Sequence, residues 1–321
     1  MTNIALIGVG VSGLSFLSFI SRKKFNIEIF EKSRGFSGRL STRRTEWGKF
    51  DHGAQFFTIK NNIFKEFLFS NFPRSFKKYE PTLKFNNNGV LENFTNSTHY
   101  YFIGGMNSYG KTIGKKINAS LNTKIKSIKK TSDNKWQLIF DDDNISKGTF
   151  DYVVSSAPFD QTRDIYSKNF SFDERLAMNP CITLMIGFKN FHDSVYPYQK
   201  FSDDSNLDSL FYQNYKFNDN KLHCWVLQAK AQWSRNNLEL PDEKIISKLL
   251  SKLNIIFGPK KPEFVKLHKW RFASTSKTKF ENEIASNSDN LYAIGDWVSG
   301  GRVEGAFLSG YNLAKHLNEF I

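Results

Sequence analysis

Short apolar runs separated by a helix-length segment dominate the first 30 residues of the chain. Residues 4–7 (Ile-Ala-Leu-Ile) form one run and residues 27–30 (Ile-Glu-Ile-Phe) form another. Runs of this length, bounded by turn residues, are typical of strands buried in a parallel sheet. The segment between them, from Ser12 to about Arg22, has room for a helix of about two to three turns. The pattern predicts a strand–helix–strand unit.

The same criteria predict alternating strands and helices further along the chain. Residues 86–89 (Asn-Asn-Asn-Gly) indicate a turn between two short strands, and Pro241 followed by Asp242 and Glu243 suits the first turn of a helix. Further strands are expected over residues 123–128, 136–140, 151–155, 182–188, 209–215, 223–229 and 291–294, and helices over residues 104–117, over residues 241–257 and from about residue 303 onward.

A glycine-rich loop joins the first predicted strand to the first predicted helix. Gly8, Gly10 and Gly13 have the spacing G-x-G-x-x-G. In a dinucleotide-binding unit these glycines allow, in order, a tight turn, approach of the backbone to a pyrophosphate, and close packing of helix on sheet. Glu31 follows Gly13 by 18 positions and is expected to accept hydrogen bonds from ribose hydroxyls. The same site is expected to include Val11, Ser12, Lys32 and Ile125, the last beside an adenine ring.

Two further features, a basic loop and a second glycine-rich motif, favour FAD over NAD as the bound dinucleotide. Residues 33–44 resemble the R-x-G-G-R-x-x-T loop of the flavin amine-oxidase superfamily, with Ser37 in place of the first paired glycine. Arg39, followed by Leu40, would add a fixed charge to the pyrophosphate, although a solvated basic loop is the simpler alternative. Near residue 300, Gly295 and Asp296 end a predicted strand, and a glycine-rich loop leads into a helix.

In a flavoprotein, the glycine-rich motif that begins at Gly295 would contact the flavin and its ribityl chain. Asp296 would accept from a ribityl hydroxyl, and the helix N-terminus would stabilise negative charge on the reduced flavin. Two dinucleotide-type motifs almost 300 residues apart therefore predict FAD. The residues expected at this second contact are Gly295, Asp296, Val303, Glu304, Gly305 and Ala306.

Residues 51–58 (Asp-His-Gly-Ala-Gln-Phe-Phe-Thr) are a third candidate contact. Small residues such as Ala54 let a loop approach a ring closely. Gln55 is expected to hydrogen-bond the flavin edge, and Phe56 or Phe57 to form a wall of the site. A strand end carrying core aromatics is the alternative.

Length and composition fit two interleaved domains in a chain of 321 residues that includes 32 Phe. We expect an α/β fold, with a Rossmann-like FAD-binding domain from residues 1–60, 102–158 and 286–321 and a mixed-sheet substrate domain from residues 61–101 and 159–285. Cys181 and Cys224 are too few for a disulfide framework, which favours a reducing cytoplasm. No apolar run approaches the roughly 20 residues of a membrane span, and glycines in cofactor register argue against an export signal.

The net charge of +14 has three interpretations: a lysine-rich soluble surface, steering of anionic small molecules, or nucleic-acid binding. The basic residues are scattered in pairs, such as Lys23–Lys24 and Lys129–Lys130, and no nucleic-acid-binding module is present. A lysine-rich soluble surface is therefore the favoured interpretation, and nucleic-acid binding is the least favoured. We expect small-molecule partners and a monomer or weak dimer.

Taken together, the motifs resemble those of the bacterial renalase-like flavoproteins. The resemblance rests on residues 38–39, 51–58, 225–235, 268–273 and 295–310. It implies a p-hydroxybenzoate-hydroxylase-like fold and oxidation of the 2- and 6-dihydro isomers of NAD(P)H to NAD(P)⁺, with O₂ reduced to H₂O₂. Ser37 departs from the family pattern, and the stretch at residues 104–106 is shorter than is usual there.

The chemistry implied by the resemblance needs no general base, because the ring nitrogen of a dihydropyridine has no proton to lose on hydride transfer to flavin N5. No metal-ligand spacing or nucleophile–base pattern competes with this reaction. An amine oxidase or desaturase, and a non-catalytic nucleotide-binding protein, are the alternatives. Gln228, His268 and Trp270 are the candidate catalytic residues, and Phe56, Trp225, Trp233 and Trp297 are the candidate pocket walls. A core position is the alternative for each tryptophan, and a structural role is the alternative for His268.

Overall fold

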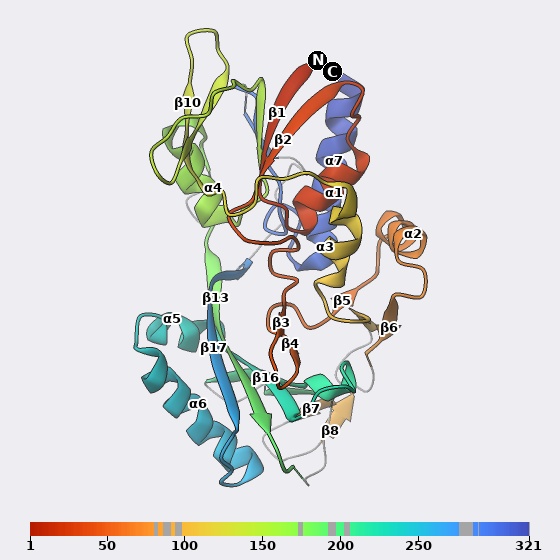
Figure 1. Cartoon of the computed structure of the whole chain (residues 1–321), viewed down its shortest axis with the longest axis vertical. Helices are drawn as coiled ribbons and strands as arrows, with labels where there is room; N and C mark the ends of the chain where they lie inside the picture. The colour runs from red at the N-terminus through yellow and green to blue at the C-terminus, as the bar shows by residue number, and fades with distance from the viewer. Residues whose placement is uncertain are drawn as a thin grey trace.

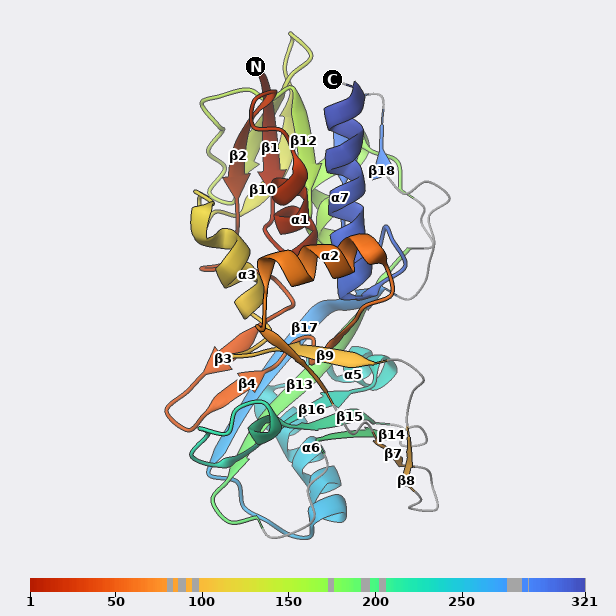
Figure 2. The same ribbon diagram turned by 90° about the vertical axis from the view of Figure 1, so that its right-hand side faces the viewer.

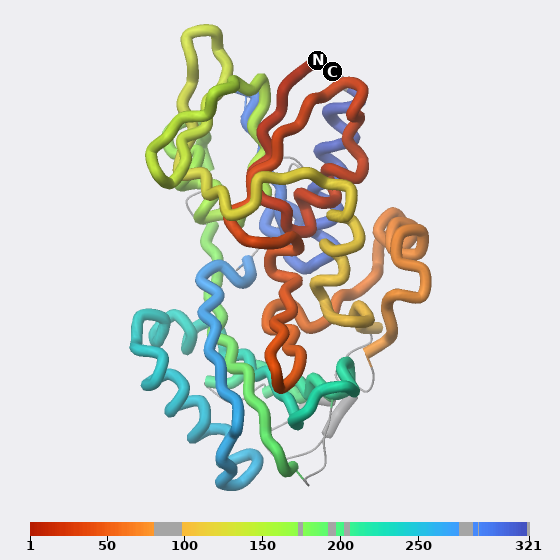
Figure 3. The backbone as a smooth tube through the Cα atoms, viewed as in Figure 1, coloured from red at the N-terminus to blue at the C-terminus, as the bar shows by residue number. Residues whose placement is uncertain are grey.

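The computed structural model describes residues 1–79, 83–85, 91–93, 98–172, 176–191, 197–201, 206–275, 285–287 and 289–320. Figure 1 shows two lobes, with both ends of the chain at the far end of the upper one. Two long strands, β13 (Met178–Phe188) and β17 (Phe264–Thr275), run from the upper lobe down into the lower one (Figure 1). The continuous tube in Figure 3 shows that the N-terminal and C-terminal segments both belong to the upper lobe.

A five-stranded sheet forms the centre of the upper lobe, in the order β18-β19-β12-β1-β2. Neighbouring strands are parallel except at the β18 edge, as expected for strands joined by helical crossovers. The predicted strand–helix–strand unit is confirmed, although the helix ends at Phe19 because the backbone of Ile20 is extended. The elements are β1 (Thr2–Ile7), α1 (Val11–Phe19), β2 (Phe25–Phe30), β12 (Tyr152–Ser155), β18 (Ala285–Ser286) and β19 (Leu291–Ala293).

Helix α7 (Arg302–Phe320) lies beside α1 on one face of this sheet (Figure 2). The two helices approach closely because Gly310 faces α1: a Cβ at this position would lie 2.1 Å from the carbonyl oxygen of Ser12. The Ser15 hydroxyl donates to the Phe307 carbonyl oxygen at 2.7 Å. The first and last helices of the described chain thus form one layer.

The opposite face of the sheet is covered by β10 (Ile125–Lys130), β11 (Trp136–Phe140) and α4 (Phe159–Tyr166). Phe159 on α4 lies 5.3 Å from Trp297, ring centre to ring centre, within the core of the upper lobe. Residues 159–166 therefore pack with the Rossmann-like sheet, although the sequence predicts them in the substrate domain. The other domain boundaries stay predictions.

The lower lobe is built on a seven-stranded sheet in the order β17-β13-β16-β15-β14-β7-β8, most of it antiparallel. Two helices cover one of its faces, α5 (Ala231–Asn237) and α6 (Asp242–Phe257), the latter starting after Pro241 as predicted. The predicted strand over 209–215 is too long, because residues 213–215 form a 3-10 turn, η3 (Gln213–Tyr215). The remaining strands are β14 (Tyr198–Phe201), β15 (Leu207–Tyr212), β16 (His223–Ala229), β7 (Leu83–Phe85) and β8 (Leu91–Asn93).

The predicted turn at residues 86–89 lies outside the described residues, between β7 and β8.

Short elements connect the lobes. The expected helix over 104–117 is reduced to α3 (Ser108–Ile113) and a 3-10 turn, because Gly104 and Gly105 have positive φ angles. The others are β3 (Thr42–Arg44), β4 (Lys49–Asp51), β5 (Phe57–Thr58), α2 (Asn62–Asn71), β6 (Phe76–Lys78), β9 (His99–Phe102), η1 (Gly114–Lys116) and η2 (Ser167–Asn169).

The predicted α/β class, with a Rossmann-like unit and a mixed second sheet, is confirmed. None of the described helices is both long and apolar enough to cross a lipid bilayer. Both cysteines are free thiols. The cytoplasmic location and the monomer or weak dimer stay predictions.

Candidate functional site

A cavity of about 1630 Å³ extends from the glycine-rich loop of the upper lobe to the sheet of the lower lobe. Its lining reaches from Glu31 at the end of β2 to Gln228 on β16 and His268 on β17. Pockets for a single small ligand usually measure roughly 300–1,000 Å³. This cavity therefore has room for a dinucleotide and a second molecule.

The three glycines of the N-terminal motif serve different purposes. Gly8 has a φ of +94°, which only glycine adopts readily. A Cβ at Gly13 would lie 2.5 Å from the Gly8 carbonyl oxygen, so this position holds the helix against the turn and does not line the cavity. A Cβ at Gly10 would meet no atom within 4 Å and would point into open space on the cavity wall. That free space is where we expect a pyrophosphate to approach.

Glu31 lies buried at the end of β2 with its carboxylate held in place by the backbone. One oxygen accepts from the Val9 N–H at 2.9 Å and the other from the Ser33 N–H at 2.8 Å. Each oxygen keeps a lone pair for a further donor such as a ribose hydroxyl. The neighbouring Lys32 donates to the Gln161 side chain at 3.0 Å, and burial lowers the pKa of its ammonium group.

Arg39 and Asp296, expected from separate motifs, meet across the cavity wall. The two guanidinium nitrogens of Arg39 donate to the two Asp296 oxygens at 3.0 and 2.5 Å, a bidentate ion pair. Arg39 also donates to the Ala273 carbonyl oxygen at 2.9 Å. The ion pair connects the basic loop around Arg39 to the segment that follows β19. Both residues line the cavity.

Replacing Arg39 by Ala should weaken FAD retention about 10- to 100-fold, because hydrogen bonds to charged groups contribute roughly 1.5–3 kcal/mol. The variant Arg39→Lys, which keeps the charge without the forked geometry, should fall between Ala and the parent. Equilibrium dialysis of FAD against the three proteins measures this. Equal retention by Arg39→Ala and the parent would show that Arg39 makes no cofactor contact.

Ser37 shows how the chain accommodates the residue that departs from the family pattern. Its φ of +90° is unusual for a residue with a side chain. The Ser37 hydroxyl accepts from the Gly110 N–H at 2.8 Å, at the point where α3 packs on the loop. A Cβ at Gly110 would lie 2.1 Å from that hydroxyl. The substitution of glycine by serine is thus matched by a glycine on α3.

The start of α7 faces the cavity as predicted, through Val303 and Ala306. Glu304 does not: its carboxylate turns away and accepts from the backbone N–H groups of Lys60 and Asn61, both at 2.7 Å. Gly305 is packed on the Ser299 carbonyl oxygen. Four residues expected to contact the cofactor do not line the cavity: Gly13, Gly295, Glu304 and Gly305. The other expected cofactor residues that line it are Gly8, Gly10, Val11, Ser12, Glu31, Lys32, Arg39, Leu40, Ala54, Phe56, Ile125, Asp296, Val303 and Ala306.

At the lower end of the cavity, three rings pack together. His268 lies 4.3 Å from Trp270 and 5.0 Å from His52, centre to centre, in edge-on arrangements. The Trp270 indole donates to the His52 carbonyl oxygen at 2.8 Å, and Gln228 donates to the Gly53 carbonyl oxygen at 2.8 Å. Gln228, His268 and Trp270, the candidate catalytic residues, thus lie on the same wall.

Both imidazoles at this end are held neutral. Burial, together with the nearby His268 and Arg43, lowers the pKa of His52 to about 3. Burial and the Arg43 charge lower the pKa of His268 to about 4. Each ring is therefore uncharged at neutral pH and has no tendency to take up a proton.

Three tryptophans and one glutamine do not line the cavity, contrary to expectation. Trp225 is fully buried on the opposite face of β16, against α6, and Trp233 on α5 packs with the same core. Trp297 is buried in the upper core and donates to the Ala157 carbonyl oxygen at 3.2 Å. Gln55 turns its side chain inward, where its amide donates to the Asp51 carbonyl oxygen and its amide oxygen accepts from Gln213 at 3.0 Å. These four side chains support the wall from behind.

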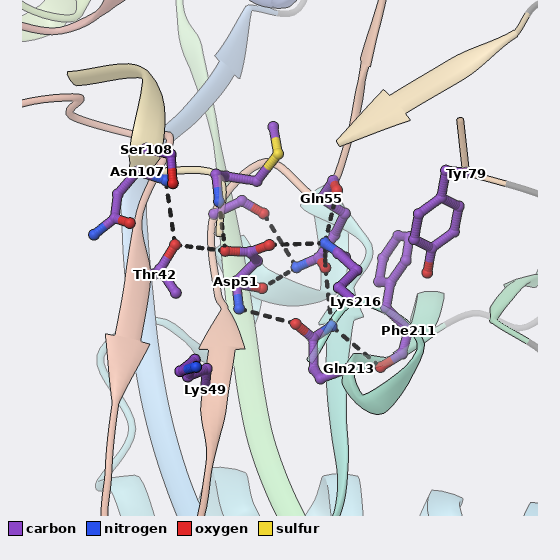
Figure 4. A network of polar contacts seen from close by, with 12 residues as sticks. Thr42, Lys49, Asp51, Gln55, Tyr79, Asn107, Ser108, Phe211, Gln213 and Lys216 are labelled. Atoms are coloured by element: carbon purple, nitrogen blue, oxygen red, sulfur yellow. Dashed lines mark hydrogen bonds and ion pairs between the residues drawn. The ribbon is translucent and has the colours of Figure 1, made fainter. Parts of the chain in front are cut away.

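Gln55 belongs to a buried polar network behind the cavity wall (Figure 4). Lys216 donates to Asp51 at 2.9 Å, and to the backbone and side-chain oxygens of Gln55 at 2.7 and 3.2 Å. Asp51 in turn accepts from the Thr42 hydroxyl at 2.6 Å and the Met106 N–H at 2.9 Å. Neither Lys216 nor Asp51 exposes any side-chain surface. The network joins the lower sheet to the loop that carries His52, Gly53 and Ala54.

The residues present fit a large polar cofactor together with a second polar molecule. Among the described side chains, four buried polar atoms on the cavity wall lack any hydrogen-bond partner: Arg43 Nε, His52 Nδ1, Thr58 Oγ1 and Asn107 Oδ1. Leaving a buried polar atom unpaired costs about 1–3 kcal/mol, so such atoms are usually satisfied in the working protein. All four belong to residues that line one cavity, which indicates that bound molecules supply the missing partners.

Comparison with known proteins agrees with this geometry. Residues 62–318 match the family model described as flavin containing amine oxidoreductase, and residues 6–68 match a NAD(P)-binding Rossmann-like domain. The structure superposes on that of an Exiguobacterium sp. 255-15 protein with the provisional name protoporphyrinogen oxidase (TM-score 0.77, 11% identity, 99% of both chains).

Two other solved structures have similar folds. One is putrescine oxidase bound to putrescine (TM-score 0.72, 12% identity, 99% of both chains). The other is an oxidoreductase from Methanosarcina mazei (TM-score 0.72, 13% identity, 98% of this chain and 100% of that one). At these identities the superpositions show the fold alone.

Proposed function

The chain belongs to the flavin-containing amine oxidoreductase family, and we propose that within it the protein is an FAD-dependent oxidase of dihydronicotinamide dinucleotides. The substrates would be the 2- and 6-dihydro isomers of NAD(P). Each loses one hydride to give NAD(P)⁺, while O₂ takes up that hydride's two electrons and its proton, with one further proton, to give H₂O₂. When bound, FAD supplies the two-electron acceptor that links these halves.

The charge of the cavity lining is the observation that carries this proposal. Among the residues that the structure describes, ten basic and five acidic side chains line the cavity. The two phosphate charges of FAD leave most of that excess uncompensated. Ion pairs engage side chains of both signs: Asp296 pairs with Arg39, and Arg271 pairs with Glu239 outside the lining. Five basic residues form no ion pair with a carboxylate among the described residues and leave the lining positive: Lys32, Arg34, Arg43, Arg44 and Arg302. A positively lined cavity favours an anionic second molecule and disfavours a cationic amine.

The neutral imidazoles support the same reaction. Loss of a hydride from a dihydropyridine leaves no proton to remove, so the wall needs only to orient the ring and exclude water. His52, His268 and Trp270 offer flat, uncharged surfaces for this purpose. Gln228 fixes the Gly53 carbonyl oxygen beside them.

Amine oxidation of another substrate is the second candidate. The family model and the fold shared with putrescine oxidase favour it. Its substrate would have to reach the same wall of His268 and Trp270 in the uncharged form, given the positive lining.

Anaerobic stopped-flow reduction of the yellow protein decides between the two. We expect the 2- or 6-dihydro isomers to bleach the flavin absorbance at least about 100-fold faster than ordinary NAD(P)H or putrescine, a difference of roughly 2.8 kcal/mol at the transition state. Faster bleaching by putrescine or another amine would establish the second candidate instead.

The rate of this reduction should be independent of pH between about pH 6 and pH 9, because no side chain has to change its protonation state. The lowered pKa values of His52 and His268 mean that both rings take up a proton only as the pH falls towards 4. Unfolded histidine protonates near its ordinary value, so the folded state should also lose stability as the pH falls below about 6.5.

The variant His268→Gln tests the role of the ring. It should slow reduction about 10- to 100-fold through lost positioning and leave the pH profile flat. A bell-shaped profile in the parent that His268→Gln flattens would instead identify His268 as an acid–base catalyst.

A further inference from the structure

Arg43 is a cationic side chain on the cavity wall that the cofactor motifs do not use. It lies on β3, opposite Phe50 of β4, in the hairpin that projects at one side of the lower lobe (Figure 2). Side chains alternate along a strand. Because Thr42 points inward to Asp51, as Figure 4 shows, Arg43 projects to the other face of the hairpin and lines the cavity.

One nitrogen of the Arg43 guanidinium group lacks a hydrogen-bond partner in the part of the chain that the structure describes. This nitrogen, Nε, is buried, and no carboxylate within the described ranges forms an ion pair with Arg43. Two neighbouring cations on the same wall differ in this respect. Lys269 donates to the Leu240 carbonyl oxygen at 2.8 Å, and Arg271 forms an ion pair with Glu239.

Arg43 shares the cavity lining with the imidazoles of His52 and His268. Its charge contributes, after burial, to the lowered pKa of both His52 and His268. The Nδ1 of His52 is a second buried polar atom without a partner on this wall. A guanidinium that shares this lining with the rings is suited to an anionic group attached to the molecule that stacks there.

We propose that Arg43 binds a phosphate oxygen of the substrate and so selects phosphorylated dihydronicotinamides over the riboside. The planar guanidinium matches the geometry of phosphate and forms charge-assisted hydrogen bonds with it. This inference rests on the proposed function and adds the group by which the substrate is recognised. Arg43 is a specificity residue and takes no part in the transfer itself.

The test uses three 6-dihydro compounds that differ in phosphate number: the nicotinamide riboside, the mononucleotide and NAD. The FAD-loaded parent, Arg43→Gln and Arg74→Gln are reduced anaerobically over a range of concentrations. Arg74 lies on the surface outside the cavity and controls for the lost charge.

We expect Arg43→Gln to raise the half-saturating concentration of the two phosphorylated compounds about 10-fold or more. Its limiting rate, its FAD affinity and its response to the riboside should stay within about 2-fold of the parent. Arg43→Lys should recover part of the loss. Equal weakening for the riboside, or no weakening for any compound, overturns the proposal.

A direct titration keeps this test separate from the proposed function. Oxidised nicotinamide mononucleotide is added to the FAD-loaded proteins and the flavin absorbance is followed, with no turnover required. Binding by the parent that Arg43→Gln weakens about 10-fold or more supports the phosphate subsite even if no dihydronicotinamide reduces the enzyme. Equal binding by both proteins, or none by the parent, overturns it.

Discussion

Gly10→Val is expected to give a folded protein that cannot hold FAD. The φ of Gly10 is −71°, which valine adopts readily, and an added Cβ meets no atom within 4 Å. The substituent would instead occupy the part of the cavity where the pyrophosphate approaches. We expect FAD affinity to fall by more than about 100-fold, the loss of roughly 3 kcal/mol of charge-assisted contact. Flavin content and thermal unfolding of the apoprotein are the measurements.

Gly13→Ala is the matched control, because its Cβ would lie 2.5 Å from the Gly8 carbonyl oxygen and 2.9 Å from the Ser156 hydroxyl. This variant should lower the unfolding temperature of the apoprotein, whereas Gly10→Val should not. A yellow Gly10→Val protein would mean that the pyrophosphate lies elsewhere.

The largest loss of stability is expected from Lys216→Met. This change leaves the carboxylate of Asp51 fully buried without its cation, 2.9 Å away in the parent. Removing one partner of a buried ion pair typically costs about 3–5 kcal/mol. Urea denaturation of the apoprotein gives the free energy of unfolding. Cofactor retention should also fall, since Lys216 holds Gln55 behind the loop of Ala54.

An exposed ion pair provides the comparison. Lys126 and Asp143 form one at 2.6 Å, with 51% and 72% of their side chains exposed. Lys126→Met should change the free energy of unfolding by no more than about 1 kcal/mol. In the Lys216→Met protein, the further change Asp51→Asn should restore part of the loss, because it removes the unpaired charge. If Lys216→Met behaves like Lys126→Met, the network contributes little to stability.

Local patterns in the sequence predicted the upper lobe well. A buried strand, three spaced glycines and an acidic residue at the next strand end define a turn that depends on neighbouring residues alone. The residues that line the lower end of the cavity were harder to predict. Trp225 and Gln228 differ by three positions on β16, so a regular strand places them on opposite faces. Because Gln228 faces the cavity, the alternation of side chains along β16 places Trp225 in the core. His268 and Trp270 are two positions apart on β17 and therefore share the face that lines the cavity.

Contacts between distant segments gave no local signal. Lys216 and Asp51 are 165 residues apart, and Arg39 and Asp296 are 257 residues apart. Glu304 matched the motif in position, yet its carboxylate serves the backbone at the start of α2. Which acceptor a side chain finds depends on the packing of both lobes, and this information is not contained in the spacing of one motif.

The pairing of α1 with α7 dictates when the cofactor site can exist during synthesis. The glycine-rich loop emerges first, but Asp296, Val303 and the helix that covers α1 follow nearly 300 residues later. Until then the apolar side chains of α1 that pack with Phe307 have no partner. The segments of the lower lobe are complete before α7 leaves the ribosome, and domains generally fold in order of synthesis. The apolar face of α1 therefore stays uncovered until α7 has been made, and the complete cofactor site forms late in folding.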